Sequence, residues 1–521
     1  MKILMRLLCI LLVLCFIGTA FIGCGKKKGG DAAGENGEGG ADGTTATEKP
    51  TNEYGEPSFT SNLPKGDLDF DGAEVAILFR DFIHNSREWK KETTEDELDE
   101  AIAMRNEAVQ EELNVKIVWQ PVASNGNDYT EYTARFHDMV INDVNSGRHY
   151  YDISANFGYP TTSNNIRDYT TNLLDTSLFP YFNFELPCWN QAIVNNTTFN
   201  DQLYYVAGDI NLSMFDAACV VWHNKTLYDA NKLASDPDSL QKHALNGNWI
   251  YDDLHRWTSA FYVDNGTSPD ARDSSDTYAL LAASYSSAPM PRDVFPYAWD
   301  LQFVVENNDG THSFNIVGNS KIDTALSNAR KLLRGSGTYS SSNANMFASG
   351  RAIFYMERLY SGHDANMAIR EMEDTYALLP MPKYDTKQTQ YATTSQDYYT
   401  LMFVLDHSYS KVPTKGEEIS AFLQLSTEIY YLGIRGYYFE TVVMPRSSKT
   451  SEKSEEIFRL IIDGIKFDYC YVYSQQLNNI NHLWRNALGE GSTDTIEKMY
   501  LNDKSDFEEA VMATDKWFGL G

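Results

Sequence analysis

The sequence lacks the short motifs that mark most enzymes and metal sites. It has 521 residues, with six cysteines and ten histidines. No two histidines form an HxxxH or HExxH pair and no CxxC occurs, so the usual zinc spacings are missing. No GxSxG, P-loop or GxGxxG motif is present either. We therefore expect neither a metal nor a cofactor, and no motif supports a catalytic function.

Cationic residues are also scarce. Lys and Arg number 43 against 72 Asp and Glu, which gives a formal net charge of -29. Nucleic-acid phosphates would be repelled by such a chain, so we expect no nucleic-acid partner. A neutral or cationic small ligand is compatible with this charge.

Long apolar runs are missing except near the N-terminus. Residues 7–22 are almost wholly apolar and follow Lys2 and Arg6. The run is shorter than the ~20 residues that a membrane-spanning helix needs, and it is typical of a signal peptide. It ends in Phe21-Ile22-Gly23-Cys24, which resembles the lipobox of bacterial lipoproteins. We expect residues 1–23 to be removed and a lipid such as palmitate to be attached to Cys24; an uncleaved signal anchor is the alternative.

Residues 24–64 form the next segment. They are rich in Gly, Ala, Thr, Glu, Asp and Pro and contain few large apolar residues. Such a composition cannot bury enough surface to offset the entropy of ordering, which predicts a disordered tether. A Gly-rich coil of ~40 residues reaches roughly 35 Å. We expect a protein held by its lipid to the extracytoplasmic face of the cell membrane.

The first third of the remaining chain alternates strands and helices. Its pattern predicts strands at 74–79, 115–122 and 152–157, with helices at 95–113 and 129–144 between them. This order implies a mostly parallel sheet with right-handed crossovers. A body of about 455 residues is too long for one core, so we expect two α/β domains.

The rest of the chain continues the mixed pattern and then becomes helical. The pattern predicts strands at 217–223, 278–283 and 401–405, a hairpin at 303–314 around Asn308-Asp309-Gly310, and helices at 252–261, 320–333, 416–432, 454–465, 481–488 and 493–518.

Two further groups of residues have plain structural interpretations. Asp67-x-Asp69-x-Asp71-Gly72 resembles the start of a calcium loop, but Leu78 stands where the loop needs a bidentate Glu. We expect an acidic turn that leads into the first strand. Cys188, Cys219 and Cys470 show no metal spacing, and we expect buried free thiols; one disulfide with a thiol left over is the alternative.

Five segments between residues 201 and 382 resemble the family 1 extracellular solute-binding proteins and run in that family's order. They are Asp201-Gln-Leu-Tyr-Tyr-Val206, Val220-Val-Trp-His-Asn-Lys-Thr-Leu227, Gly247-Asn-Trp-Ile-Tyr-Asp-Asp-Leu254, Phe347-Ala-Ser-Gly-Arg-Ala-Ile-Phe354 and Tyr376-Ala-Leu-Leu-Pro-Met-Pro382. The proline that the family places after the first segment is absent, and Gly-Asn replaces the usual residues at the start of the third.

The resemblance implies a periplasmic-binding-protein type II fold, in which two α/β lobes are joined by crossing segments and hold the ligand between them. It assigns residues 65–210 and 374–436 to lobe one, and residues 211–373 and 437–521 to lobe two. It also implies a monomer that delivers a solute, most often a sugar or oligosaccharide, to the transmembrane subunits of an ABC importer.

Candidate ligand-binding residues follow from the loops at strand ends, where ligands sit in open α/β sheets. A sugar needs aromatic faces together with carboxylate, amide or guanidinium groups. Residues of these types at the expected strand ends and crossings are Arg80, Asp81, Tyr159, Asp209, Asn211, Glu357, Arg358, Tyr360, Asp397, Tyr398 and Tyr399. Trp299 and Trp484 are possible stacking residues, but core packing is the better interpretation of both.

Other functions stay open at this point. The ligand could be a peptide or another polar solute. A lipid-anchored glycoside hydrolase would need two carboxylates ~5–9 Å apart in a cleft, and the many acidic residues do not exclude such a pair by counting. An adhesive surface protein would need no cleft.

Overall fold

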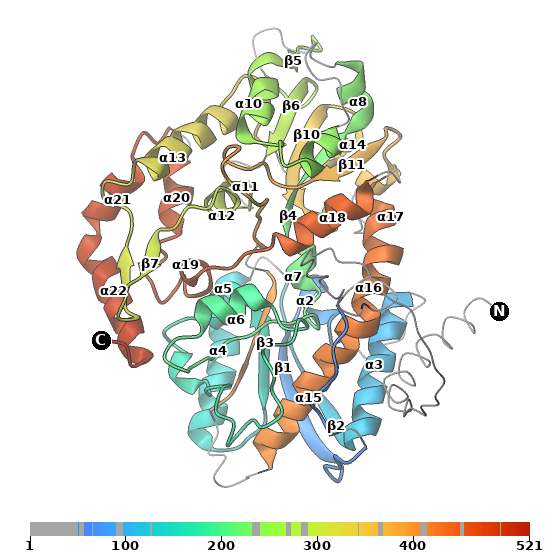
Figure 1. The fold of residues 1–521 in the computed structure, drawn as a ribbon, viewed down its shortest axis with the longest axis vertical. Helices are drawn as coiled ribbons and strands as arrows, with labels where there is room; N and C mark the ends of the chain where they lie inside the picture. Colours follow the sequence, from blue (N-terminus) through green and yellow to red (C-terminus); the bar gives the residue numbers. More distant parts are fainter. Residues whose placement is uncertain are drawn as a thin grey trace, which may run out of the picture.

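A computed structural model of the protein describes residues 51, 57–64, 66–89, 97–125, 128–231, 240–266, 272–282, 290–341, 343–362, 368–396, 398–406, 414–448, 453–489 and 491–521. The expected signal peptide, Cys24 and most of the expected tether lie outside these residues. The prediction of a disordered tether up to residue 64 is wrong for residues 57–64, because Phe59 packs on Tyr431 with ring centroids 5.5 Å apart and Leu63 is buried. Two α/β lobes lie one above the other, each with its own sheet (Figure 1). Within the described ranges, no helix is both long and apolar enough to cross a membrane.

The sheet of lobe one has the strand order β12-β3-β1-β2. Its strands are β1 (Ala73–Asp81), β2 (Val115–Ala123), β3 (Ile153–Phe157) and β12 (Thr400–Val404). β1 pairs in parallel with β2 and β3, which confirms the expected parallel β-α-β-α-β unit. β12 joins antiparallel to β3 from more than 200 residues away in the chain. The helices of this lobe are α2 (Ile83–Ser86), α3 (Glu97–Leu113), α4 (Tyr129–Ser146), α5 (Gly158–Thr161), η1 (Arg167–Tyr169) and α6 (Gln191–Thr197).

The sheet of lobe two has the order β11-β4-β10-β6-β5, and β9 also pairs with β6. Its strands are β4 (Cys219–Asn224), β5 (Tyr262–Val263), β6 (Thr277–Ala282), β9 (Thr338–Tyr339), β10 (Ala352–Arg358) and β11 (Tyr376–Leu379). Its helices are α8 (Lys225–Ala230), α9 (Leu240–Leu245), α10 (Tyr251–Ala260), α11 (Met290–Asp293), α12 (Phe295–Ala298), α13 (Ser320–Leu333), α14 (Ala344–Ala348), η2 (Leu359–Gly362), η3 (Ala368–Glu371) and α18 (Ser454–Asp463).

Three segments connect the lobes. The first contains α7 (Ser213–Asp216), and the third is a long helix that starts as α15 (Lys415–Ile429). That helix continues through η5 (Tyr430–Ile434), α16 (Arg435–Tyr437), η6 (Tyr438–Val443) and α17 (Met444–Ser447). The predicted return to lobe one near Asp374 is wrong, because β11 still pairs with β4 in the second sheet. The second crossing therefore lies between β11 and β12.

A buried carboxyl group joins these crossings. Glu88 Oε1 accepts a hydrogen bond from the backbone N–H of Ser213, at 2.6 Å, and Ser213 Oγ accepts one from the backbone N–H of Thr400, at 2.8 Å. Burial raises the pKa of Glu88 to about 7. Glu88 thus ties the first crossing to the strand that follows the second.

The C-terminal arm, residues 466–521, contacts both lobes. It contains α19 (Tyr469–Val472), α20 (His482–Ala487), α21 (Ile496–Asn502) and α22 (Lys504–Trp517), so the single helix predicted at 493–518 is two helices. On lobe one, the ring of Trp517 stacks on Tyr204 at 4.3 Å. On lobe two, Arg334 donates to the Gly489 carbonyl at 2.8 Å. Assigning the arm to lobe two alone is therefore wrong; it runs along one side of both lobes (Figure 1).

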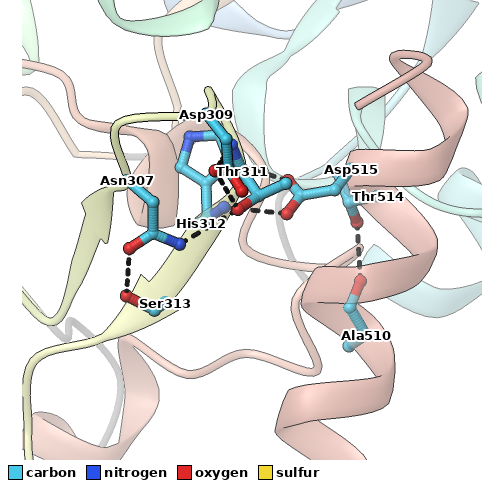
Figure 2. A network of polar contacts seen from close by, with 8 residues as sticks. All are labelled: Asn307, Asp309, Thr311, His312, Ser313, Ala510, Thr514 and Asp515. Carbon is cyan, nitrogen blue, oxygen red and sulfur yellow. Dashed lines mark hydrogen bonds and ion pairs between the residues drawn. The ribbon is translucent and has the colours of Figure 1, made fainter. Parts of the chain in front are cut away.

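A hairpin of β7 (Val304–Glu306) and β8 (His312–Phe314) packs against this arm. Its turn is the predicted one, with Gly310 at a positive φ of 83°. His312 donates its backbone N–H to Asp515 on α22 at 2.8 Å, and its ring nitrogen Nδ1 lies 2.6 Å from the same carboxylate (Figure 2). This pair fixes the hairpin to the last helix.

The expected structural residues are where the sequence places them. Cys188, Cys219 and Cys470 are buried free thiols, which confirms the simpler interpretation. Trp299 and Trp484 are fully buried in the core. Asp69 accepts hydrogen bonds from the Asp71 backbone and the Asn114 side chain, as expected for an acidic turn. In the described part of the chain, no cluster of three His, Cys, Asp or Glu residues could hold a metal ion.

Acid should destabilise lobe two through His223. Its side chain is buried against Phe354, its ring nitrogens have no hydrogen-bond partner, and burial lowers its pKa to about 3. Below pH 6.5 the unfolded chain binds a proton that the folded chain does not, so stability falls as the pH falls, by roughly 3 kcal/mol at pH 4.5. We expect His223→Phe to remove this loss, measured by urea unfolding at pH 7 and 4.5. Equal acid sensitivity in His223→Phe and in a His255→Phe control would contradict this.

Candidate functional site

A cleft lies between the lobes, beside the carboxyl end of β3. The empty space within it, open solvent included, is about 370 Å³. Its lining is Gly158, Tyr159, Asp293, Gln396, Tyr399, Tyr471, Ser474, Asn481, His482 and Arg485. Lobe one, the second crossing, α11 of lobe two and the C-terminal arm all contribute, so a ligand here would contact both lobes and the arm.

The lobe-one wall is built directly after β3. A Cβ on Gly158 would lie 2.6 Å from the Tyr399 ring, so only glycine allows this close packing. Tyr159 follows on α5, and its hydroxyl donates to Asn479 Oδ1 at 2.9 Å. Its ring stacks on His482, with centroids 5.6 Å apart. Tyr159 therefore presents an aromatic side chain to the cleft and already contacts the arm.

The opposite wall comes from the arm. α20 carries His482 and Arg485, and the turn before it carries Ser474 and Asn481. Ser474 Oγ donates to Asn481 Oδ1 at 2.7 Å. Burial, together with the charge of Arg485, lowers the pKa of His482 to about 3. His482 is thus a neutral imidazole at physiological pH, and this wall offers hydrogen-bonding groups with one charged side chain.

The charged side chain of this wall, Arg485, forms an ion pair with Asp293. Arg485 Nε lies 3.0 Å from each carboxylate oxygen of Asp293, and Arg485 Nη2 also contacts Oδ2. Burial raises the pKa of Asp293, while the guanidinium of Arg485 opposes this rise. Asp293 belongs to lobe two and Arg485 to the arm, so the pair also holds these two parts together.

Arg80, at the end of β1, does not line this cleft. Its guanidinium lies over four aromatic rings, with the nearest, Phe157 and Phe82, at 4.2 and 4.5 Å. It donates to Asn85 Oδ1 at 3.3 Å and Ser124 Oγ at 3.2 Å. These contacts hold the guanidinium of Arg80 away from the lining residues, and the half-buried Asp81 beside it is also outside the lining.

The residues at the end of β10 lie behind the cleft wall. Arg358 Nε bonds Glu357 Oε1 at 2.9 Å, and its Nη2 donates to the Tyr360 hydroxyl at 2.8 Å. Its Nη1 donates to Gln396 Oε1 at 2.6 Å, and Gln396 lines the cleft. Arg358 thus orients Gln396.

The remaining predicted residues have other places. Asp209 accepts from Arg435 of the long helix at 2.8 Å, and Asn211 Oδ1 accepts from the Gly208 backbone at 3.0 Å. Both are buried at the first crossing. Tyr398 has its ring 5.3 Å from the Arg80 guanidinium and 6.0 Å from that of Arg358, so it packs between the lobes. Asp397 lies outside the described residues.

The expectation that ligand-binding residues follow the strand ends therefore includes Tyr159 and Tyr399 of the lining. It does not include most residues on the opposite side of the cleft. The lining residues that it does not find are Asp293, Gln396, Tyr471, Ser474, Asn481, His482 and Arg485. Five of these belong to the C-terminal arm. The helix at 481–488 is predicted from sequence, but no local signal indicates that it faces β3.

A second groove lies between the long helix and α18. Phe439, Met444, Phe458 and Ile462 give it apolar walls, and it also encloses about 370 Å³. None of its lining residues belongs to a strand of either sheet. The interlobe cleft is the stronger candidate because aromatic and polar groups from several elements converge there.

Comparison with known proteins gives likeness in fold only. No family model matches the chain, and no curated protein matches its sequence. An ABC transporter solute-binding protein from Thermotoga lettingae, bound with α-D-tagatose, is 12% identical with a TM-score of 0.50, covering 84% of this chain and 100% of that chain.

Two further solved structures are similar at slightly lower scores. The GacH receptor of Streptomyces glaucescens, in complex with acarbose, is 12% identical with a TM-score of 0.49, covering 85% of this chain and 99% of that chain. The lacto-N-biose-binding protein of Bifidobacterium longum is 10% identical with a TM-score of 0.49, covering 87% and 99%. The chain has the periplasmic-binding-protein type II fold, as the sequence predicts.

Proposed function

We propose that this protein is the substrate-binding component of an ABC importer and that it captures a carbohydrate or oligosaccharide. The observation that carries this proposal is the cleft between the lobes, where aromatic rings and uncharged hydrogen-bonding groups converge. The fold is shared with a solute-binding protein bound with α-D-tagatose, which supports the same class of ligand.

The lining suits the two kinds of surface that a sugar presents. Tyr159 and Tyr471 are half-buried and offer aromatic rings for C–H faces, and the buried Tyr399 supports them. Gln396 and Asn481 offer amide groups that can donate to and accept from hydroxyls. A peptide would also need partners for its charged ends, and the one ion pair of the lining is already closed.

Capture would work by a shift between open and closed forms. A ligand favours the closed form only if it binds that form more tightly than the open one. A sugar that contacts Tyr159 of lobe one together with Asp293 of lobe two would make both contacts only in the closed form. Such a sugar would therefore bind the closed form more tightly. The transmembrane subunits of the importer would then recognise the closed form.

This role requires no bond to be broken. A glycoside hydrolase needs an acid and a second carboxylate ~5–9 Å apart. Among the described residues of the lining, Asp293 is the sole carboxylate, and Arg485 engages both of its oxygens. This arrangement supports binding over hydrolysis, so we propose a binding protein and not an enzyme.

Anchoring at the membrane is part of the proposal and rests on residues 1–64 of the sequence. A lipid on Cys24 would hold the folded body at the membrane, where it can reach the importer. We expect Cys24→Ala to move the protein from the membrane fraction to the soluble fraction, followed by detergent phase partitioning. A variant that stays in the membrane fraction would favour an uncleaved anchor.

The function itself is tested by ligand-induced stabilisation of the full mature protein. The panel would contain neutral mono- and oligosaccharides and short peptides, with sugar products analysed in parallel. A ligand at 100 times its Kd should add about 2.7 kcal/mol of stability. Stabilisation by peptides alone, or release of shorter sugars, would contradict the proposal.

A further inference from the structure

The two charged side chains of the lining pair with each other. Arg485 and Asp293 form a two-pronged ion pair whose side chains are 24% and 15% exposed, so the pair is partly accessible. His482 beside it is neutral. Behind the wall, the positive charge of Arg358 is matched by Glu357 at 2.9 Å. The described lining therefore offers no unmatched charge to a ligand.

A charged ligand would have to change this arrangement. A carboxylate approaching Arg485 would compete with Asp293, whose two oxygens already accept from the guanidinium. Displacing Asp293 would leave its own charge in a desolvated site, and placing both carboxylates beside one guanidinium would leave one negative charge uncompensated. A cationic ligand meets the same difficulty with Arg485.

An uncharged hydroxyl avoids that cost. The carboxylate oxygens of Asp293 can accept further hydrogen bonds, and a guanidinium has five N–H donors, more than one carboxylate uses. Sugar hydroxyls can therefore bond to the pair without separating it. Specificity can arise when binding of the wrong ligand leaves a charge unpaired.

We propose that the Asp293–Arg485 pair selects ligands by charge, so that the cleft accepts uncharged polyhydroxy ligands and rejects their uronic-acid and amino-sugar counterparts. This rests on the proposed function and names the ligand class of the same site. Asp293 and Arg485 are then specificity-determining residues.

Removing the charge of either Asp293 or Arg485 should weaken the selection against charged sugars. Asp293→Asn keeps the shape of the side chain but leaves the charge of Arg485 unmatched, so an anionic sugar would become its partner. The reciprocal variant Arg485→Gln removes the cation that is hydrogen-bonded to Asp293 and leaves the neighbouring Arg292 as the cation beside it. Since burial already raises the pKa of Asp293, that variant should lose affinity for neutral sugars with a smaller gain for amino sugars.

The experiment is calorimetric titration of the full mature protein. Maltose, cellobiose, lactose and galactobiose serve as neutral probes, digalacturonate and cellobiouronic acid as anionic probes, and the glucosamine disaccharide as the cationic probe. Asp252→Asn, an exposed residue of α10, is the control for a change in net charge. Urea unfolding of each variant shows whether it is folded.

The unmodified protein and Asp252→Asn should bind a neutral probe and neither the uronates nor the glucosamine disaccharide. Asp293→Asn should bind a uronate with an affinity at least about tenfold above the detection limit at which the unmodified protein shows no binding, and added salt should weaken that binding. Uronate binding by the unmodified protein, or no gain in folded Asp293→Asn while a neutral sugar binds, overturns the charge selection and leaves the proposed function standing. Failure of the unmodified protein to bind any probe overturns both.

Discussion

Replacing Trp484 by alanine is expected to lower the free energy of unfolding by about 3–5 kcal/mol. Trp484 is fully buried on α20 and contacts Trp299 and Phe303 of lobe two, with ring centroids 6.5 Å from each. Removing the indole leaves a cavity that the surrounding rings cannot fill without moving. Because α20 also carries His482 and Arg485, the loss should extend to the cleft.

Urea unfolding followed by intrinsic fluorescence and by circular dichroism measures this loss. The matched control is Met512→Ala on α22 of the same arm, since Met512 is 64% exposed and its truncation should change stability by less than about 0.5 kcal/mol. If both variants unfolded at the same urea concentration, the arm would not be packed on lobe two as the structure has it.

Replacing Tyr159 by alanine should weaken sugar binding by roughly 100-fold, which corresponds to about 2.7 kcal/mol. The variant removes the aromatic face that lobe one gives to the cleft and also the hydroxyl that donates to Asn479. Ring contacts of this kind contribute about 0.5–1.5 kcal/mol beyond area burial, and the lost area and the loosened arm add to that.

Two further variants separate these contributions. Tyr159→Phe keeps the ring and loses only the bond to Asn479, so its affinity should lie between those of the unmodified protein and Tyr159→Ala. Tyr150→Ala removes a tyrosine of lobe one that is 56% exposed and does not line the cleft, and it should bind normally. Unchanged affinity in Tyr159→Ala would place the ligand elsewhere, and the groove between the long helix and α18 would be the next candidate.

The sequence by itself determined the local elements and the class of fold. The apolar spacing at 95–113 and 320–333 matches α3 and α13 to within two residues, and Asn308-Asp309-Gly310 marks the turn of the hairpin. These features are local, because helix periodicity, strand alternation and turn chemistry depend on residues a few positions apart. The expected burial of the cysteines and of Trp299 and Trp484 follows from the same residue-level preferences.

Only the tertiary structure decided which strand-end residues face the cleft. Arg80 and Arg358 stand at the ends of β1 and β10 as predicted, but aromatic rings and Glu357 already surround their charges. Whether a side chain at a strand end is available to a ligand depends on partners elsewhere in the chain, which sequence spacing does not reveal.

Dependence on distant contacts also explains why the position of the C-terminal arm could not be predicted from the sequence. Tyr159 meets Asn479 and Asp293 meets Arg485 across 320 and 192 residues of sequence. No periodic pattern encodes such a pairing, because it arises when separately formed elements pack so as to bury their apolar faces. The fold class could therefore be predicted from the sequence, whereas the wall that completes the binding cleft could not.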